Sequence, residues 1–304
     1  MLFGRCAAAA FVLTVCALGI RTGSAVDLFV DNRDGDNIYD GHSQHEVDQR
    51  SGPVRTIRRA LEKVRPGDTI HIANHGTPYY ESLEIVGSRF SGGFRIEGNG
   101  AVVSGAKEAP FAAWKPLGNG VWKFTPRRKA FYQLVSGDQA LPEFTVAAGA
   151  PSLPAIPAGQ WAAWHGSIYY RALPAQPGAP QDDAPLAFAA EEVGITLLDV
   201  NDVHIHDLEL RHFRLDGVNV HDRCQNIILD NVKLIENGRA GLAVGGSSLV
   251  GIKDSVIAGN RVAQVLNSEV AQTEIISTKI ASAGGASIRK TGGHVLVEGE
   301  EVRE

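Results

Sequence analysis

The most constraining feature of this sequence is a short repeat that runs over residues 193–280. Gly217-Val218-Asn219-Val220 recurs one unit later as Gly241-Leu242-Ala243-Val244, and residues 227–234 recur at 250–257. These offsets give a period in the twenties, which is typical of solenoid proteins. Apolar residues alternate within each unit, which indicates strands rather than helices. The repeats therefore predict a parallel β-helix, in which each unit is one coil of three short strands and coils stack about 4.8 Å apart.

The N-terminal segment, residues 1–25, has the pattern of a secretion signal. Arg5 supplies the positive charge, residues 6–20 are apolar, and Gly23-Ser24-Ala25 offers small residues for cleavage. The apolar stretch is short for a transmembrane helix. We therefore expect a cleaved signal, no membrane span, and a secreted or periplasmic mature protein.

The charge balance of the mature chain limits its partners. Without the signal, 27 basic and 34 acidic residues remain, which gives a net charge of −7. This balance argues against nucleic acid or an anionic membrane as the partner. The chain is 44% hydrophobic, which is ample for a packed core.

The segment before the repeats predicts a cap and the first coils, over residues 26–105. Residues 26–32 alternate as a strand, and residues 52–67 have the apolar stripe of a helix between Pro53 and Pro66-Gly67. Laid over the first coil, this helix would cover the open end of the solenoid. Asp and Asn are dense over residues 31–37; such a run suits either calcium or ordinary turns, and it does not match the helix-loop-helix calcium motif.

Residues 106–190 interrupt the pattern and predict a β-rich insertion before the regular coils of 191–304. All four tryptophans lie in this segment, which is also rich in proline. Exposed aromatic rings stack on sugar rings, so Trp161, Trp164 and Tyr170 are candidate substrate-binding residues. The alternative is that these rings form the small core of the insertion.

Several N-terminal segments match a known family. They are Phe29-Val30-Asp31-Asn32, residues 52–61 (GPVRTIRRAL), Pro66-Gly67-Asp68-Thr69-Ile70, Tyr79-Tyr80-Glu81 and Gly98-Asn99-Gly100. With the repeats that follow, they resemble secreted right-handed parallel β-helix proteins of the pectate-lyase-like superfamily. The resemblance implies an all-β, right-handed parallel β-helix. It leaves the activity open, because that superfamily contains lyases, hydrolases, esterases and proteins that are not enzymes.

In that superfamily the polysaccharide groove usually runs along the first sheet of the helix, between the loops on either side. Here the first strand of one coil is Gly217-Val218-Asn219-Val220, and Asn219 should point outward as a substrate-binding residue. Charged side chains are dense on both flanks of this strand. Together with an aspartate one coil earlier, they are the candidate catalytic residues: Asp199, Arg211, Arg214, Asp216, His221, Asp222 and Arg223.

Two reactions would use these residues differently. Two arginines could hold a uronate carboxylate while His221 or an arginine removes a proton, as in β-elimination. Two carboxylates could instead form a glycosidase pair, which requires a separation of roughly 5–9.5 Å. Asp216 and Asp222 lie about 20 Å apart on one extended strand, so Asp199 with Asp222, one coil apart, is the better pair. The catalytic sets of polygalacturonases and of the main pectate lyases are not found, so the resemblance transfers no catalytic residue.

Two further patterns concern the fold. Polar residues recur at the second turn of successive coils, where we expect a ladder that stabilises the turns: Asp207, Asn231, Asp254 and Ser277. The repeats fade after Ala283, and no capping helix follows the last expected strand near Val295. An uncovered last coil would allow oligomer formation there.

These observations leave two functions open. The first is a secreted carbohydrate-active enzyme, either a polysaccharide lyase or a glycoside hydrolase. The second is a β-helix without catalytic activity that binds polysaccharide or packs on a cell surface. Polysaccharide is the expected partner in both.

Overall fold

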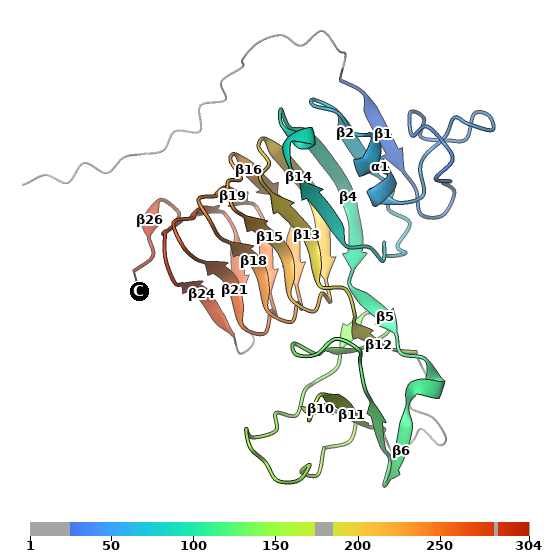
Figure 1. Cartoon of the computed structure of the whole chain (residues 1–304), viewed down its shortest axis with the longest axis vertical. Coiled ribbons are helices and arrows are strands. Elements are labelled where there is room, and N and C mark those ends of the chain that lie inside the picture. Colours follow the sequence, from blue (N-terminus) through green and yellow to red (C-terminus); the bar gives the residue numbers. More distant parts are fainter. Residues whose placement is uncertain (1–24, 174–184, 283–284, 304) are drawn as a thin grey trace, which may run out of the picture.

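The computed structural model describes residues 25–173, 185–282 and 285–303, and over these residues the chain forms a parallel β-solenoid (Figure 1). The expected signal lies outside these ranges, apart from Ala25. Sheet B, with six strands, contains the first strand of each coil. Its strands, in spatial order, are β3 (Leu83–Val86), β13 (Val193–Leu198), β15 (Asp216–His221), β18 (Ala240–Val244), β21 (Ala263–Asn267) and β24 (Ala286–Lys290).

Sheet A, with twelve strands, carries the remaining strands of the coils. Its main path is β1 (Asp27–Val30), β2 (Thr69–Ile72), β4 (Phe94–Ser104), β14 (Val203–Arg211), β16 (Ile227–Asp230), β19 (Leu249–Lys253), β22 (Gln272–Ile276), β25 (His294–Val297) and β26 (Glu300–Glu301). Beside it lie β17 (Lys233–Ile235), β20 (Val256–Ala258) and β23 (Lys279–Ala281). All of these strands pair in parallel except β26, which returns antiparallel along β25.

The register of sheet B confirms the repeat that the sequence predicts. Asn219 pairs with Thr196 on one side and with Ala243 on the other, so equivalent residues of successive coils lie side by side. Val218 and Val220 are fully buried, as expected for inward residues. Their side chains belong to one hydrophobic core that continues through the solenoid.

The predicted ladder at the second turn is confirmed. Asp207, Asn231, Asp254 and Ser277 all have φ near +50°, a conformation that short polar side chains tolerate. The Asn231 side chain donates to Asp207 Oδ1 at 3.0 Å and so ties two coils together.

The predicted helix is shorter than its pattern. Helix α1 covers Ile57–Lys63, with Thr56 as its N-cap. Residues before it are extended, because Val54 bridges to Val30 and its N–H donates to Phe29 O. The apolar face of α1 joins the solenoid core, and the helix lies beside β1 (Figure 1).

Two antiparallel sheets lie between β4 and β13 in the chain and extend below the solenoid in Figure 1. The first is β5 (Ala106–Glu108), β12 (Leu186–Ala189), β8 (Leu134–Ser136) and β9 (Gln139–Ala140). The second is β10 (Trp161–Trp164), β11 (Ser167–Arg171), β7 (Val121–Phe124) and β6 (Lys115–Gly118). We call this part the insertion. Among the described residues, no helix has the length and apolar character needed to span a bilayer.

Candidate functional site

Strand β15 divides the predicted catalytic residues into two groups. Asp216 begins the strand and His221 ends it. At about 3.3 Å per residue, Asp216 and Asp222 are separated by about 20 Å. The residues before β15 and those after it therefore cannot act on one bond, and they form two separate groups.

Asp216 is the centre of the first group, and it is fully buried. Its carboxylate accepts hydrogen bonds from Arg239 Nε and Asn219 Nδ2, both at 2.9 Å, and from Arg239 Nη2. Hydrogen bonding to this carboxylate raises the pKa of Arg239 above its usual range. A carboxylate enclosed in this way is suited to fixing Asn219 and Arg239 in place, rather than to touching a substrate itself.

Arg214 connects this group to the insertion. One Nη donates to the backbone oxygen of Lys129 at 3.0 Å, and the other pairs with the Glu192 carboxylate. Arg214 is only 8% exposed, whereas the Glu192 side chain is 54% exposed. Glu192 is thus an accessible carboxylate at this end of β15, as is the exposed Glu191 beside it.

We call Glu192, Arg214, Asp216, Asn219 and Arg239 the polar junction. It lies where the outer face of sheet B meets the insertion. Two of its buried atoms, Asn219 Oδ1 and Arg214 Nε, have no hydrogen-bond partner among the described residues. Nearly all buried polar atoms in folded proteins are paired, so these two atoms, both closed to solvent, are exceptions within the polar junction.

Arg211, which the sequence offers as a uronate-binding residue, holds the insertion instead. Its guanidinium pairs with Asp138 at 2.8 Å, in the turn between β8 and β9, and with Glu209 at 3.2 Å. Arg261 acts in the same way from another coil, since it pairs with Glu143 of the insertion. These two arginines of the solenoid hold the insertion in place through ion pairs.

The second group lies beyond the other end of β15 and is open to solvent. His221, Asp222 and Arg223 are all exposed, and Arg223 Nε pairs with Asp199 at 3.1 Å. Leu198 and His221 are partners in the β13–β15 register, so Asp199 and Asp222 follow at equivalent positions of neighbouring coils, as predicted. Their catalytic role stays a prediction.

The aromatic candidates lie mainly inside the insertion. Trp161 is 2% exposed and Tyr170 is 4% exposed, and both belong to a core of the insertion. The Trp161 indole also donates to Leu141 O at 2.9 Å. Neither ring offers a face to a sugar, because the insertion needs large apolar side chains for its own packing. Trp164 is half-buried against Tyr169 beside a shallow hollow of about 540 Å³, so its sugar-binding role stays a prediction.

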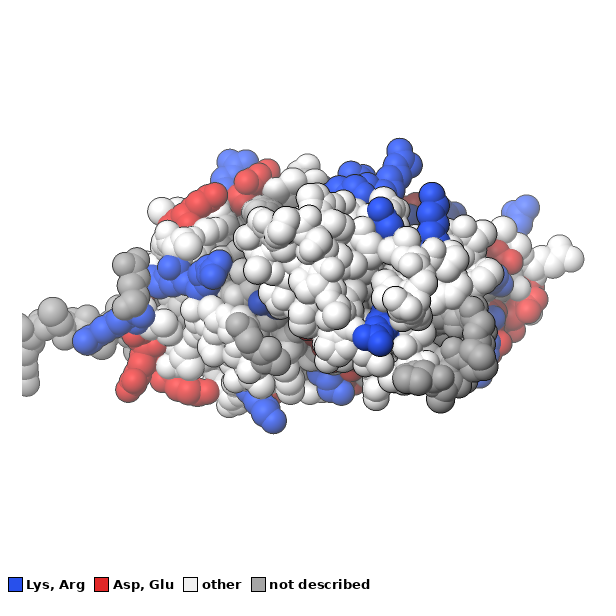
Figure 2. Space-filling view, turned by 90° about the horizontal axis from the view of Figure 1, so that it is seen from below, with Lys and Arg blue, Asp and Glu red and all other residues white. Residues whose placement is uncertain are grey.

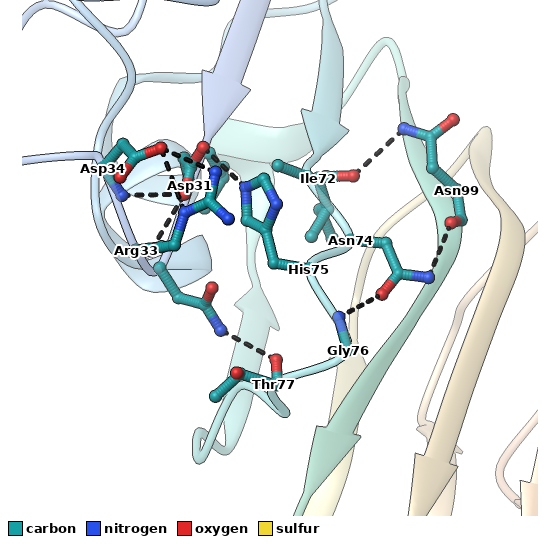
Figure 3. A network of polar contacts seen from close by, with 12 residues as sticks. Asp31, Arg33, Asp34, Ile72, Asn74, His75, Gly76, Thr77 and Asn99 are labelled. Carbon is teal, nitrogen blue, oxygen red and sulfur yellow. Dashed lines mark hydrogen bonds and ion pairs between the residues drawn. The ribbon is translucent and has the colours of Figure 1, made fainter.

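The run of Asp and Asn residues forms the network in Figure 3. Asp31 Oδ1 accepts from the N–H groups of Arg33 and Asp34, while Oδ2 contacts His75 Nε2 at 2.9 Å. Burial acts to raise the pKa of Asp31, but these hydrogen bonds outweigh it and lower that pKa. Asp31, Asp34 and His75 are close enough to hold a metal ion. Calcium prefers oxygen ligands alone, so the imidazole and the Arg33 guanidinium on Asp34 fit calcium poorly.

Sequence reasoning missed Arg239 and Glu192. Arg239 follows Asp216 by one repeat period, and Asp216 pairs with Ala240 in the register of β15 and β18. Apart from Asp199, the predicted residues flank one strand of one coil, whereas the ion pairs join neighbouring coils. Reading charged residues at the repeat offset would have found the Asp216–Arg239 pair.

Known proteins were compared with this chain by family, by sequence and by structure. A scan against protein-family models finds no match, and neither does a search of curated proteins. Similar solved structures include XylC in complex with xylose (10% identity, TM-score 0.46), a glycoside hydrolase (10%, 0.48) and the GH136 lacto-N-biosidase from Eubacterium ramulus (9%, 0.38). The alignments cover 84%, 83% and 83% of this chain and 64%, 74% and 45% of those chains. This chain therefore spans less than two thirds of XylC, and no functional residue carries over.

Proposed function

We propose that this protein binds a polysaccharide on the outer face of sheet B, with the polar junction as the central contact. The observation that carries this proposal is Asn219. Its side-chain nitrogen is held by Asp216, while its buried oxygen Oδ1 has no partner among the described residues. A buried acceptor left unpaired costs about 1–3 kcal/mol. A sugar hydroxyl is a donor that would remove this cost once the side chains that close this atom off from solvent move aside.

The surroundings of Asn219 suit an extended glycan. Thr196, Asn219, Ala243 and Leu266 form one row across four coils. The spacing of about 4.8 Å between coils is similar to the length of one pyranose unit. Arg239, 29% exposed, offers donors beside this row. Thr196 and Leu266 are partly exposed, whereas Asn219 is 5% and Ala243 is 4% exposed. A saccharide lying along the solenoid axis would therefore contact the outer members of this row directly and would reach Asn219 only after neighbouring side chains move.

Hydrolysis is the second candidate function, and Glu192 is the observation that favours it. Glu192 is an accessible carboxylate paired with Arg214 of the polar junction, and the exposed Glu191 adjoins it in the chain. Glycosidases act through two carboxylates on either side of the scissile bond. In this version Glu192 contacts the glycan and Asp216 acts as a positioning residue through Arg239. We also propose that the protein is secreted and that it belongs to the pectate-lyase-like superfamily. Contact between subunits at the last coil is part of the same proposal.

Binding and turnover should be measured together on a panel of neutral and acidic polysaccharides. Affinity electrophoresis gives the dissociation constant, while new reducing ends and unsaturated uronate absorbance report hydrolysis and elimination. We expect Asn219→Ala to weaken binding at least tenfold. Gln272→Ala, which removes an exposed amide from sheet A, is the matched control and should bind normally.

The two functions predict different results for Glu192→Gln. If the protein hydrolyses the glycan, this variant should lose turnover and still bind. Full binding by Asn219→Ala, at normal thermal stability, would contradict the polar junction as the binding site.

A further inference from the structure

The charge of this protein is unevenly distributed. The described residues of the insertion, 105–173 and 185–190, contain seven Lys and Arg but three Asp and Glu. The other described residues contain 20 basic and 28 acidic side chains. The negative net charge of the chain therefore conceals a basic insertion on an acidic solenoid.

The acidic residues of the insertion do little to neutralise it. Asp138 pairs with Arg211 and Glu143 pairs with Arg261, and both of those arginines belong to the solenoid. Five basic residues of the insertion lie close together in the fold and form no ion pair with any described carboxylate. We call them the basic surface: Lys115, Lys123, Arg127, Arg128 and Lys129.

These five residues gather at one end of the sheet formed by β10, β11, β7 and β6. Lys115 and Lys123 are directly opposite each other in the antiparallel β6–β7 pair. Like charges in that position destabilise a sheet, and the Lys123 ammonium lies 5.6 Å from the centre of the Tyr169 ring. Arg127 and Arg128 are exposed just after β7 ends. Lys129 Nζ donates to Gly166 O at 2.8 Å, which ties this segment to the turn between β10 and β11.

Lys129 connects the basic surface to the polar junction through its backbone. The backbone oxygen of Lys129 accepts the hydrogen bond from Arg214, so one residue belongs to the basic segment and contacts the junction. In Figure 2, which looks onto the insertion end, several Lys and Arg side chains stand on the right half of this face, and Asp and Glu lie mainly toward its two ends, where further Lys and Arg lie beside them. A ligand at the junction would therefore extend into a positive field.

We propose that the basic surface binds the anionic groups of the polysaccharide that occupies the polar junction, so the ligand is an acidic glycan bearing carboxylate or sulfate groups. This inference rests on the proposed function. The junction supplies hydroxyl recognition, and the basic surface supplies charge recognition a short distance along the same chain. A glycan is favoured over nucleic acid because the adjoining Asn219 acceptor suits sugar hydroxyls.

The test compares two fourfold variants that lower the net charge equally. The first is Lys115→Gln, Lys123→Gln, Arg127→Gln and Arg128→Gln. The matched control is Arg65→Gln, Lys279→Gln, Arg289→Gln and Arg303→Gln, four exposed cations without a carboxylate partner among the described residues. The probes are polygalacturonate for carboxylate, dextran sulfate for sulfate, dextran as a neutral polymer, and duplex DNA. Affinities are measured between low and high salt, because exposed charge contacts are screened beyond about 10 Å at 0.1 M ionic strength.

We expect the wild-type protein to bind at least one anionic glycan at least tenfold more tightly than dextran at low salt, and to lose this preference at high salt. The first variant should lose the preference, and the control should keep it. Polygalacturonate and dextran sulfate identify which anionic group is bound.

Equal binding of charged and neutral glycans, abolished by Asn219→Ala, would overturn this inference and leave the proposed function intact. Equal loss in the two fourfold variants would also overturn it, because overall charge would then explain the effect. Tighter binding of DNA than of any glycan would overturn the assignment of the ligand. Absence of binding to every glycan would overturn the proposed function itself.

Discussion

Two Asp–Arg pairs lie at the two ends of strand β15, and they provide a matched test of what burial contributes. Asp216 with Arg239 is the inner pair, with the carboxylate fully buried and the arginine 29% exposed. Arg223 with Asp199 is the outer pair, with side chains 76% and 39% exposed. Both join neighbouring coils. We predict that replacing each residue by alanine, singly and together, gives very different coupling energies for the two pairs.

The expected magnitude follows from the environment of each pair. Asp216→Ala removes the acceptor of two bonds from Arg239 and one from Asn219. Removing one partner of a buried pair costs about 3–5 kcal/mol. Because Arg239 can be partly rehydrated, we expect the lower limit, about 3 kcal/mol, and a coupling energy of about 2 kcal/mol. The exposed pair should couple by less than about 1 kcal/mol.

The free energy of unfolding is measured by urea titration, followed by both tryptophan fluorescence and far-UV circular dichroism. Coincident transitions are required before the values are compared, because repeat proteins can unfold in steps. A change in midpoint at constant slope reports stability. Equal coupling energies for the two pairs would refute the reasoning, since burial would then have no effect on the strength of the interaction.

Two other perturbations test the turns and the acid stability of the solenoid. The His212 side chain, 2.9 Å from Glu236, lowers the pKa of Glu236 from its ordinary 4.5, although burial acts in the opposite direction. Stability from such a group is present above the unfolded pKa and is lost as pH falls through the folded pKa. Glu236→Gln should therefore flatten the decline in unfolding free energy below about pH 4.5. An unchanged decline would contradict this cause. Gly246 has φ of +65°, and a Cβ there would lie 2.3 Å from Asp222 O, whereas a Cβ on Gly251 would meet nothing within 4 Å. Gly246→Ala should therefore destabilise by more than about 1 kcal/mol and Gly251→Ala by less than about 0.5 kcal/mol in thermal unfolding, and similar values would show that this turn can relax.

The proposed ligand changes how the overall charge of the chain should be interpreted. A net charge of −7 argues against a polyanionic partner only if the charge is spread evenly. The structure places an excess of basic residues on the insertion and an excess of acidic residues on the solenoid. Two of the few acids of the insertion are already paired with the solenoid arginines Arg211 and Arg261. Local charge, rather than net charge, decides which partner can approach the polar junction.

The sequence by itself determined the solenoid. Alternating apolar residues fix which side chains face the core, and the repeat period fixes which residues of successive coils become neighbours. The rows through Asn219 and through Asn231 could therefore be predicted before any coordinates. Asp216 and Arg239 also lie one repeat period apart, since 23 positions separate them.

Only the tertiary structure decided which charged and aromatic side chains are available for function. The contact of Arg214 with Lys129 O joins residues 85 positions apart, and the pairing of Arg211 with Asp138 spans 73 positions. No period relates the insertion to the coils, so its contacts follow from packing alone. The same packing buries Trp161 and Tyr170, whose aromatic character alone cannot distinguish a core residue from a sugar-binding surface. Local pattern determines strands and rows, whereas burial and long-range pairing depend on how the insertion packs against the solenoid.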